Sequence, residues 1–281
     1  MKLKEFKVKS IDPKEISTPE LHGYLLSSIA PRPIAFASTI DKDGQVNVSP
    51  FSFFNVFGAN PPIVVFSPAR RVRDNTTKHT LENIEATKEC VINIVTEEIV
   101  HQVSLASTEY EKGVNEFEKA GLTPVASDLV NVPRCLESKV ALECKVNDII
   151  YTGKEGGAGN LVICEVIKIH IHEEVLDETG KISTEKMRLV ARMGESWYCK
   201  AYGDALFQIP KPLRTLGAGF DQLPKEILLS EVLSGNDLAQ LANVEEIPQG
   251  PYKTDVKEHA RAKQLLHQGN LKEAWETLII N

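Results

Sequence analysis

The segment Ala30–Pro62 reads APRPIAFASTIDKDGQVNVSPFSFFNVFGANPP and determines the fold class that the sequence predicts. Two short apolar runs within it, Ile34–Ile40 and Val46–Ser49, flank the turn residues Asp41–Gly44. Runs of β-branched and aromatic residues on both sides of a Gly-containing turn are typical of a β-hairpin, because glycine readily adopts the positive φ of a tight turn. The segment therefore predicts an antiparallel pair of strands.

Further strand-like runs extend this pattern along the chain. Four runs rich in Val, Ile and Leu are bounded by turn residues and predict strands at residues 62–66, 90–95, 140–146 and 161–171. Short helical patterns between them predict accessory helices at residues 80–88, 96–107 and 114–120. Many strands with few helices between them favour an antiparallel barrel over a doubly wound parallel sheet. The predicted fold class is therefore mainly β.

After Gly203 the pattern changes to a helical period that is broken by prolines. Helices are predicted at residues 223–233, 236–241, 255–267 and 271–279. The last two helices are separated by Gly269-Asn270 and predict a helical hairpin. We thus expect a β-rich domain over residues 1–202 and a helical C-terminal extension over residues 203–281.

The overall composition is that of an ordinary globular protein. The chain has 281 residues, and its 32 Lys and Arg against 39 Asp and Glu give a formal net charge of −7 at pH 7. Since no block of like charges occurs, neither a nucleic acid nor a membrane surface is expected as a partner. The five cysteines form no C-x-x-C pair, which argues for reduced thiols and against a zinc or disulfide framework. No apolar run has the length of a signal peptide or membrane span, so a cytoplasmic protein is expected.

Common catalytic signatures are missing from the sequence. The absence of G-x-G-x-x-G, G-x-x-x-x-G-K-S/T, H-E-x-x-H and G-x-S-x-G argues against the usual dinucleotide, P-loop, zincin and serine-hydrolase sites. The segment Ala30–Pro62 instead mixes hydroxyls, aromatic rings and prolines, which suits a flat aromatic ligand with a phosphate tail. In the alternative interpretation, Phe51, Phe53 and Phe57 alternate into the barrel core and the serines merely end strands.

A second candidate element is the basic, hydroxyl-rich run Arg70–Asn83, which leads into a predicted helix. A helix N-terminus offers unpaired N–H donors and a partial positive charge, so Lys78 and Thr80 at this point predict a cradle for a phosphate. In the alternative interpretation, Thr80 is a plain N-cap.

Several of these pieces together carry a family resemblance. They are Pro31–Thr39, the Asp43-Gly44 turn, Asn47, Pro50–Asn55, Pro61-Pro62, the pattern Lys78-x-Thr80-x-x-Asn83, and Ala191–Tyr198. With this spacing, residues 20–200 resemble the flavin reductase-like, FMN-binding split-barrel family, and in particular its flavoredoxin-like branch. The resemblance implies a six-stranded antiparallel Greek-key split barrel, a homodimer, and FMN bound near the dimer interface.

The resemblance also implies which residues bind the cofactor. The expected FMN-binding residues are Ser38, Thr39, Ser49, Pro50, Phe51, Ser52, Phe53, Lys78, Thr80 and Asn83. The first two, with Lys78 and Thr80, would contact the phosphate and ribityl chain, while Pro50–Phe53 would lie along the isoalloxazine edge. Arg32 and Arg71 would either reach the phosphate or form surface ion pairs. No catalytic side chain is expected, because hydride transfer to flavin N5 requires no protein acid or base.

Two departures from the family pattern bear on function. The common Lys-Asp-Thr reads Lys78-His79-Thr80, which should leave phosphate binding intact. The Gly-Asp-His of many NAD(P)H-using members reads Gly159-Asn160-Leu161, so the His that would contact the nicotinamide is missing. NAD(P)H therefore remains one candidate electron donor, and a protein donor is favoured.

These inferences predict an FMN-binding oxidoreductase, flavin reductase-like or flavoredoxin-like, that passes electrons to a small-molecule or protein redox partner. The alternative is a non-catalytic FMN-binding or regulatory protein whose helical tail contacts a partner.

Two further features of the sequence each have a structural and a functional interpretation. The glycine-rich segment Gly153–Gly159 is either a lid or a flexible turn. His170 and His172 share one side of a predicted strand and could ligate a metal. Since no third ligand is evident, no metal is expected to bind.

Overall fold

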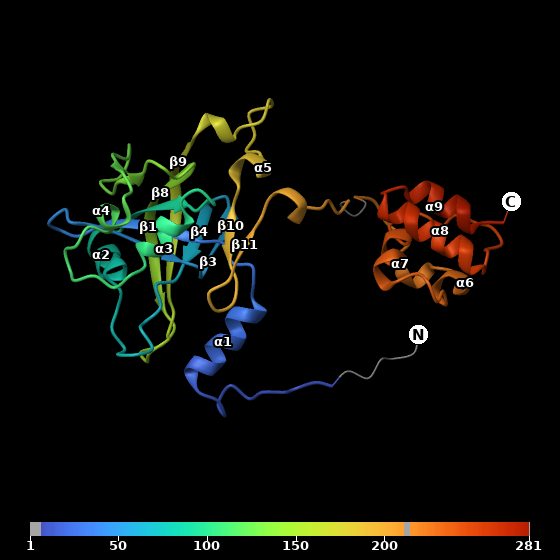
Figure 1. Ribbon diagram of the computed structural model, residues 1–281, viewed down its shortest axis with the longest axis horizontal. Helices are drawn as coiled ribbons and strands as arrows, with labels where there is room; N and C mark the ends of the chain where they lie inside the picture. Colours follow the sequence, from blue (N-terminus) through green and yellow to red (C-terminus); the bar gives the residue numbers. More distant parts are fainter. Residues whose placement is uncertain (1–6, 211–213, 281) are drawn as a thin grey trace. The chain divides into compact units, whose positions relative to one another are not determined.

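The computed structural model describes residues 7–210 and 214–280. The chain divides into two compact units, one spanning Lys9–Phe207 and one that contains the chain from Gln208 onward (Figure 1). The division falls a few residues beyond the boundary expected after residue 202. The two units are described separately below.

The larger unit is built on one antiparallel sheet in the strand order β2-β1-β5-β8-β9-β4-β3. Its seven strands are β1 (Ala35–Ile40), β2 (Val46–Phe51), β3 (Phe54–Ala59), β4 (Pro62–Phe66), β5 (Glu89–Ile94), β8 (Val140–Tyr151) and β9 (Asn160–Ile171). The predicted hairpin is confirmed as β1 and β2, with Ser38 opposite Val48 and with Gly44 at φ 82° in the turn.

The two edge strands of this sheet are neighbours in sequence. β2 ends at Phe51 and β3 begins at Phe54, so only Ser52 and Phe53 connect them. Since a chain this short spans roughly 10 Å at most, the sheet must curl until its two edges approach each other. No ladder joins β2 to β3 among the described residues, so the barrel is split along this line.

The sheet has seven strands in place of the six that were expected. The strand that the sequence did not reveal is β3, which lies at an edge and contains a β-bulge between Val56 and Gly58. Its apolar residues Val56 and Phe57 are exposed, so the inward–outward alternation that reveals a strand is absent.

Strand β1 is buried on both faces. Ala35 and Ala37 point into a core that contains Phe66. Phe36 points to the opposite face and packs against Phe117 of α4 (Glu116–Ala120), with ring centroids 6.4 Å apart. Successive strand residues face opposite sides of a sheet, which explains why a continuous apolar run was required here.

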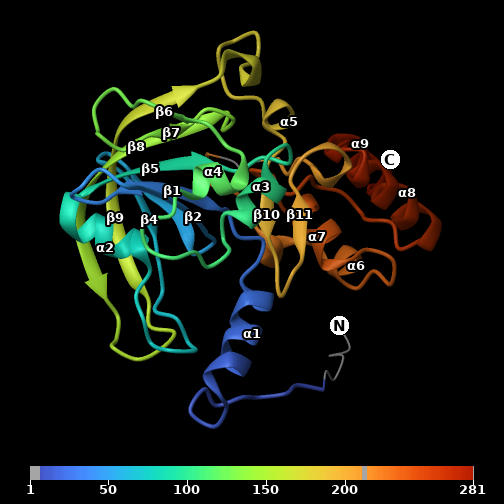
Figure 2. The ribbon, with the colours of Figure 1, turned by 60° about the vertical axis from the view of Figure 1, so that its left-hand side comes forward.

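Short elements complete the larger unit. They are α1 (Thr18–Ser28), α2 (His79–Thr87), α3 (Val100–Leu105), α5 (Thr184–Met187), two 3-10 turns (Glu173–Val175 and Gly203–Ala205) and the strand pairs β6 (Pro124–Val125) with β7 (Arg134–Cys135) and β10 (Val190–Arg192) with β11 (Tyr198–Lys200). Helix α1 was not predicted, because none of its residues is buried and its sequence has no core-facing stripe. Figure 2 shows it projecting away from the sheet.

The glycine-rich segment forms the turn between β8 and β9 and is tied to a neighbouring loop. Gly157 N–H donates to Arg70 O at 3.0 Å, and Arg70 N–H donates to Ala158 O at 2.9 Å. Asn75 Nδ2 donates to Lys154 O at 3.0 Å. The segment is therefore hydrogen-bonded along the loop that precedes α2.

The smaller unit is helical, as predicted, with its own apolar core. It contains a 3-10 turn (Phe220–Gln222), α6 (Lys225–Leu228), α7 (Gly235–Leu241), α8 (Val256–His267) and α9 (Leu271–Leu278). The predicted hairpin is confirmed as α8 and α9, which lie side by side in Figure 1. Trp275 is buried and donates from Nε1 to Leu241 O at 3.1 Å.

One predicted helix in this unit, at residues 223–233, is wrong in extent. The observed helix α6 covers only Lys225–Leu228. Beyond it the Ser230 hydroxyl accepts the N–H groups of Val232 and Leu233, at 3.2 and 3.1 Å. A serine side chain that takes backbone donors in this way competes with helix continuation. Among the described residues, no helix is both long and apolar enough to cross a membrane.

Candidate functional site

The N-terminus of α2 leaves backbone donors free. Lys78 occupies the N-cap position, and its side chain makes no capping hydrogen bond. The N–H groups of Leu81 and Glu82 donate to Lys78 O, but no acceptor within the described chain receives those of His79 and Thr80. Because aligned peptide dipoles place a partial positive charge here, this helix end favours an anion.

The Lys78 ammonium group adds to this positive character. The side chain is half-buried, and within the described chain it has no acidic partner at ion-pair distance. Burial, and next the nearby Arg71, lowers the pKa of Lys78 from its usual value. Arg71 itself is bonded to Thr76 Oγ1 at 2.9 Å and to Glu109 at 3.2 Å. Of the two interpretations of Arg71, the structure contains the ion pair.

Thr80 and Asn83 lie in α2 but point into the protein. Thr80 Oγ1 donates to Asn47 Oδ1 at 2.8 Å, and Asn83 Nδ2 donates to Thr39 Oγ1 at 3.1 Å. Thr39, Thr80 and Asn83 are all buried. Thr80 is therefore not the N-cap, and these three side chains join α2 to the β1–β2 hairpin instead of meeting the surface.

The same buried network ends in a carboxyl group that sequence reasoning missed. Glu116 accepts Asn47 Nδ2 at 2.7 Å and Val48 N–H at 3.0 Å. Burial raises the pKa of Glu116, while these hydrogen bonds oppose the increase. The available signal was Asn47, an amide within an otherwise apolar strand, because a buried polar group requires partners.

Ser38 lies on the opposite face of β1 from Thr39. Its hydroxyl donates to Pro133 O at 2.7 Å and accepts Asn93 Nδ2 at 3.2 Å, and the side chain is fully buried. Adjacent strand residues necessarily point to opposite faces. The structure therefore does not bring Ser38 and Thr39 together around one ligand.

The segment Ser49–Phe53 lies along the split between the edge strands. Phe51 is buried and packs on Phe66 with ring centroids 5.5 Å apart, as the core interpretation expected, but that interpretation is wrong for Phe57, which is exposed, and for Phe53. Ser49, Pro50 and Ser52 are half-buried, and Phe53 is exposed. Hydroxyl and backbone groups are thus accessible along this segment.

Strand β2 carries part of this segment and also contacts α2 near its N-terminus. Asn47, which bonds Thr80 of α2, and Ser49 are two residues apart on one face of β2, or about 7 Å along the strand. The positive N-terminus of α2 and the half-buried hydroxyl segment therefore belong to one region.

Arg32 has a role that neither sequence interpretation foresaw. It is buried, and its guanidinium donates to Ile29 O and Met193 O, each at 2.8 Å, and to Leu26 O. Its Nε–H donates to Ser52 Oγ at 3.4 Å. Arg32 is thus neither a surface ion pair nor an exposed phosphate ligand, because it is buried and three of its five donors bond carbonyl groups.

The residues present fit the flavin mononucleotide that the family resemblance implies. A phosphate requires N–H donors and a cation, and the N-terminus of α2 supplies both through His79, Thr80 and Lys78. A flat ring with polar edges requires accessible hydroxyl and backbone groups, which Ser49–Ser52 supplies.

Asn160, which stands where many family members have an acidic residue, is buried at the start of β9. Its backbone N–H donates to Ser67 Oγ at 3.0 Å, and its Nδ2 donates to Pro68 O at 2.8 Å. Its Oδ1 is buried without a hydrogen-bond partner. Asn160 therefore ties β9 to the end of β4.

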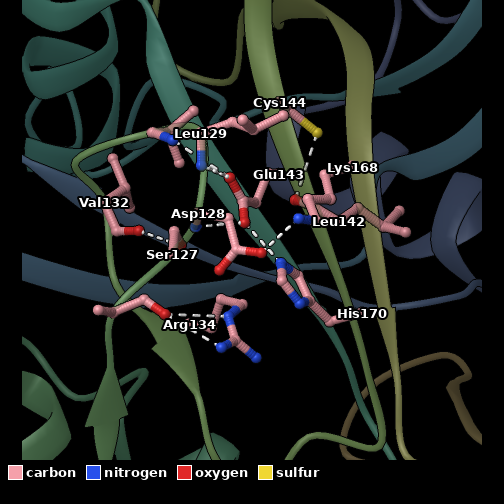
Figure 3. Close-up of polar contacts among 12 residues, drawn as sticks. Ser127, Asp128, Leu129, Val132, Arg134, Leu142, Glu143, Cys144, Lys168 and His170 are labelled. Atoms are coloured by element: carbon pink, nitrogen blue, oxygen red, sulfur yellow. Dashed lines mark hydrogen bonds and ion pairs between the residues drawn. The ribbon is translucent and has the colours of Figure 1, made fainter.

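The histidine pair of the sequence separates in the structure. His170 contacts the buried carboxylate of Glu143, while His172 lies 4.0 Å from Glu174. Figure 3 shows the surroundings of Glu143, with Asp128 as a third group close enough to share a metal ion with His170.

The oxygens of Glu143 are already occupied by donors. They accept the N–H groups of Asp128 at 2.8 Å, Leu129 at 2.7 Å and Val130 at 3.1 Å, as well as His170 Nε2. A carboxylate offers about four acceptor positions, so a metal ion would have to displace protein donors. The cluster is built to hold a loop.

Comparison with known proteins agrees with this fold. A curated relative from Aquifex aeolicus, an uncharacterized protein, is 39% identical over 196 residues, which are 70% of this chain and 97% of the relative. Nitrilotriacetate monooxygenase component B from Bacillus cereus has a similar structure, with a TM-score of 0.68 and 29% identity over 73% of this chain and all (100%) of that one.

A second similar structure is a candidate flavin reductase with a split barrel domain from Shewanella frigidimarina NCIMB 400. Its TM-score is 0.59 at 27% identity, covering 70% of this chain and 95% of that one. The architecture thus defines a protein of the flavin reductase-like split-barrel class. The model of the flavin reductase like domain matches residues 27–189, and the chain belongs to that family.

Proposed function

We propose that this protein is an FMN-binding oxidoreductase that passes electrons between a donor and a redox partner through the bound flavin. The observation that carries the proposal is Lys78, a half-buried cation without an acidic partner in the described chain, at a helix N-terminus that no side chain caps. Membership of the flavin reductase like family supports the flavin as the ligand.

The protein groups bind and orient, and the flavin supplies the electron chemistry when bound. Lys78 and the free N–H groups of α2 hold the phosphate. Ser49–Ser52 lies along the ring and donates or accepts hydrogen bonds at its polar edge. Two buried hydrogen bonds, from Thr80 to Asn47 of β2 and from Asn83 to Thr39 of β1, keep α2 in position against the β1–β2 hairpin. We place no acid or base among these residues, because hydride transfer requires none.

The electron donor can be identified by absorption spectroscopy of the FMN-loaded protein. Oxidised flavin absorbs at about 450 nm. We expect this absorbance to stay unchanged over minutes when NADH or NADPH is added anaerobically, and to be bleached by dithionite. The reason is that Asn160-Leu161 replaces the Asp-His of many NAD(P)H-using family members, so the His that would contact the nicotinamide is missing.

Other outcomes of this experiment distinguish the remaining functions. Rapid bleaching by either nucleotide would identify an NAD(P)H-linked reductase. A flavin that neither nucleotide nor dithionite reduces would favour a regulatory module with FMN as a ligand. Failure to bind added FMN would overturn the proposed function.

We further propose that the larger unit forms a homodimer through its exposed apolar residues. Val56 and Phe57, neighbours on edge strand β3, are 66% and 69% exposed. Apolar side chains grouped at an unpaired strand edge are typical of an interface.

The Phe57→Lys variant tests this interface. We expect the dimer dissociation constant to rise about 30-fold or more, since truncating a central aromatic residue typically removes at least 2 kcal/mol. Sedimentation velocity measures it. Leu229→Lys in the smaller unit, a residue of similar exposure at 68%, serves as the control and should leave the mass unchanged. A Phe57→Lys protein with wild-type mass would argue against this interface.

A further inference from the structure

Arg32 is a buried cation that binds groups from three separate segments. Arg32 is only 6% exposed. The guanidinium contacts the carbonyls of Leu26 and Ile29 at the end of α1 and that of Met193 in the turn between β10 and β11. A fourth of its five donors, Nε–H, reaches Ser52 Oγ.

The charge of Arg32 is not balanced by a carboxylate. Among the described residues none forms an ion pair with it. The carbonyls at the end of α1 contribute roughly half a negative charge, and the neighbouring Arg192 adds a positive one. Burial, and next Arg192, lowers the pKa of Arg32 from its usual value, but an arginine stays protonated at neutral pH.

An unbalanced buried charge is costly to fold, and neutral amide donors could satisfy the same carbonyls without that cost. A negatively charged ligand would therefore stabilise this buried positive charge, which no carboxylate of the described protein balances. Ser52 shows where that group would lie, because its hydroxyl accepts from Arg32 and has no other partner within the described chain. Its hydrogen remains free to donate outward from the segment Ser49–Phe53.

We propose that Arg32 is a positioning residue that stabilises the negatively charged, reduced form of the flavin through Ser52. This inference rests on the proposed function, which places the ring along Ser49–Phe53. A reductant such as dithionite supplies two electrons and water supplies one proton, which leaves the ring with one negative charge. That charge is stabilised by a buried cation and by a hydroxyl that the cation polarises.

The test compares the affinities of each protein for oxidised FMN and for dithionite-reduced FMN under anaerobic conditions. In Arg32→Gln we expect reduced FMN to lose affinity about tenfold more than oxidised FMN, which is equivalent to a fall of about 30 mV in the two-electron midpoint potential. Arg32→Lys retains the charge and should retain the wild-type ratio of affinities.

Arg192→Gln is the matched control. Arg192 pairs with Arg32 across a backbone bridge, but its guanidinium lies over the ring of Tyr198, 4.7 Å from the centroid, and not on Ser52. It removes the same charge from the same neighbourhood, and the ratio of affinities should stay within about threefold of wild type.

Each outcome decides a specific point. Equal losses of affinity for both forms in Arg32→Gln would show that Arg32 only clamps the chain, and would overturn the inference. If that variant does not fold, Ser52→Ala decides: a lost preference for reduced FMN supports the inference and an unchanged ratio overturns it. If the wild-type protein binds FMN in neither form, the proposed function itself fails.

Discussion

Replacing Glu143 by Ala is expected to lower the free energy of unfolding of the larger unit by about 3 kcal/mol or more. The change removes the acceptor of three backbone N–H groups, from Asp128, Leu129 and Val130, and of His170. A buried donor without its partner costs roughly 1–3 kcal/mol. Glu89 of β5 also accepts Asn131 N–H at 2.9 Å, and Val130 and Val132 of the same loop are buried against Val91 and Ala141.

Urea denaturation measures the global effect, and hydrogen exchange of a peptide spanning residues 126–132 measures the local one. We expect these amides to lose protection in Glu143→Ala by at least tenfold, which corresponds to about 1.4 kcal/mol. Glu111→Ala is the control, since that side chain is exposed and within the described chain makes no hydrogen bond. Unchanged protection in Glu143→Ala would mean that the loop is held by other contacts.

The same carboxylate predicts a dependence of stability on pH. Burial alone would raise the pKa of Glu143, but hydrogen bonds from Asp128 N–H, His170 and Leu129 N–H outweigh it and lower the pKa below its usual 4.5. A pKa that is lower in the folded than in the unfolded state stabilises the protein at pH above the unfolded value, and this contribution is lost as pH falls through the folded value. The stability difference between wild type and Glu143→Gln should therefore be largest near neutral pH and shrink below about pH 4.5.

Replacing Lys78 by Ala is expected to weaken FMN binding by about 10- to 100-fold. A hydrogen bond between charged groups contributes roughly 1.5–3 kcal/mol, and the half-buried position of Lys78 reduces screening by salt. Fluorescence titration with FMN measures the dissociation constant. Lys88→Ala is the control. It removes the same charge from the same helix, but Lys88 is exposed at the opposite end of α2.

The comparison with riboflavin sharpens this test. Riboflavin lacks the phosphate, so its affinity should be the same for wild type and Lys78→Ala. Equal weakening of both ligands would place Lys78 at the ring or in the fold, and unchanged FMN affinity would contradict the phosphate site.

Thr80→Val separates position from contact at the same helix end. Its hydroxyl bonds Asn47 inside the protein, so we attribute any loss of FMN affinity in this variant to movement of α2. That distinction was not accessible from the sequence, where Lys78 and Thr80 stood as equivalent members of one motif.

The sequence by itself determined the elements whose signal is local. The β1–β2 hairpin, the strands β4, β5, β8 and β9, and the helical hairpin of the smaller unit follow from apolar periodicity and turn residues. The placement of Lys78 at the start of a helix is equally local, because it depends on the few residues that follow it. The motif spacing was specific enough to indicate the family that the comparisons confirm.

Only the tertiary structure decided which polar groups are free to meet a ligand. Ser38, Thr39, Thr80 and Asn83 read as ligand contacts, yet each is buried because a partner distant in sequence satisfies it. Arg32 and Met193 meet across 161 residues. Helix α1 and strand β3 stayed hidden because none of their residues is fully buried, and periodicity reveals an element only where one of its faces is buried.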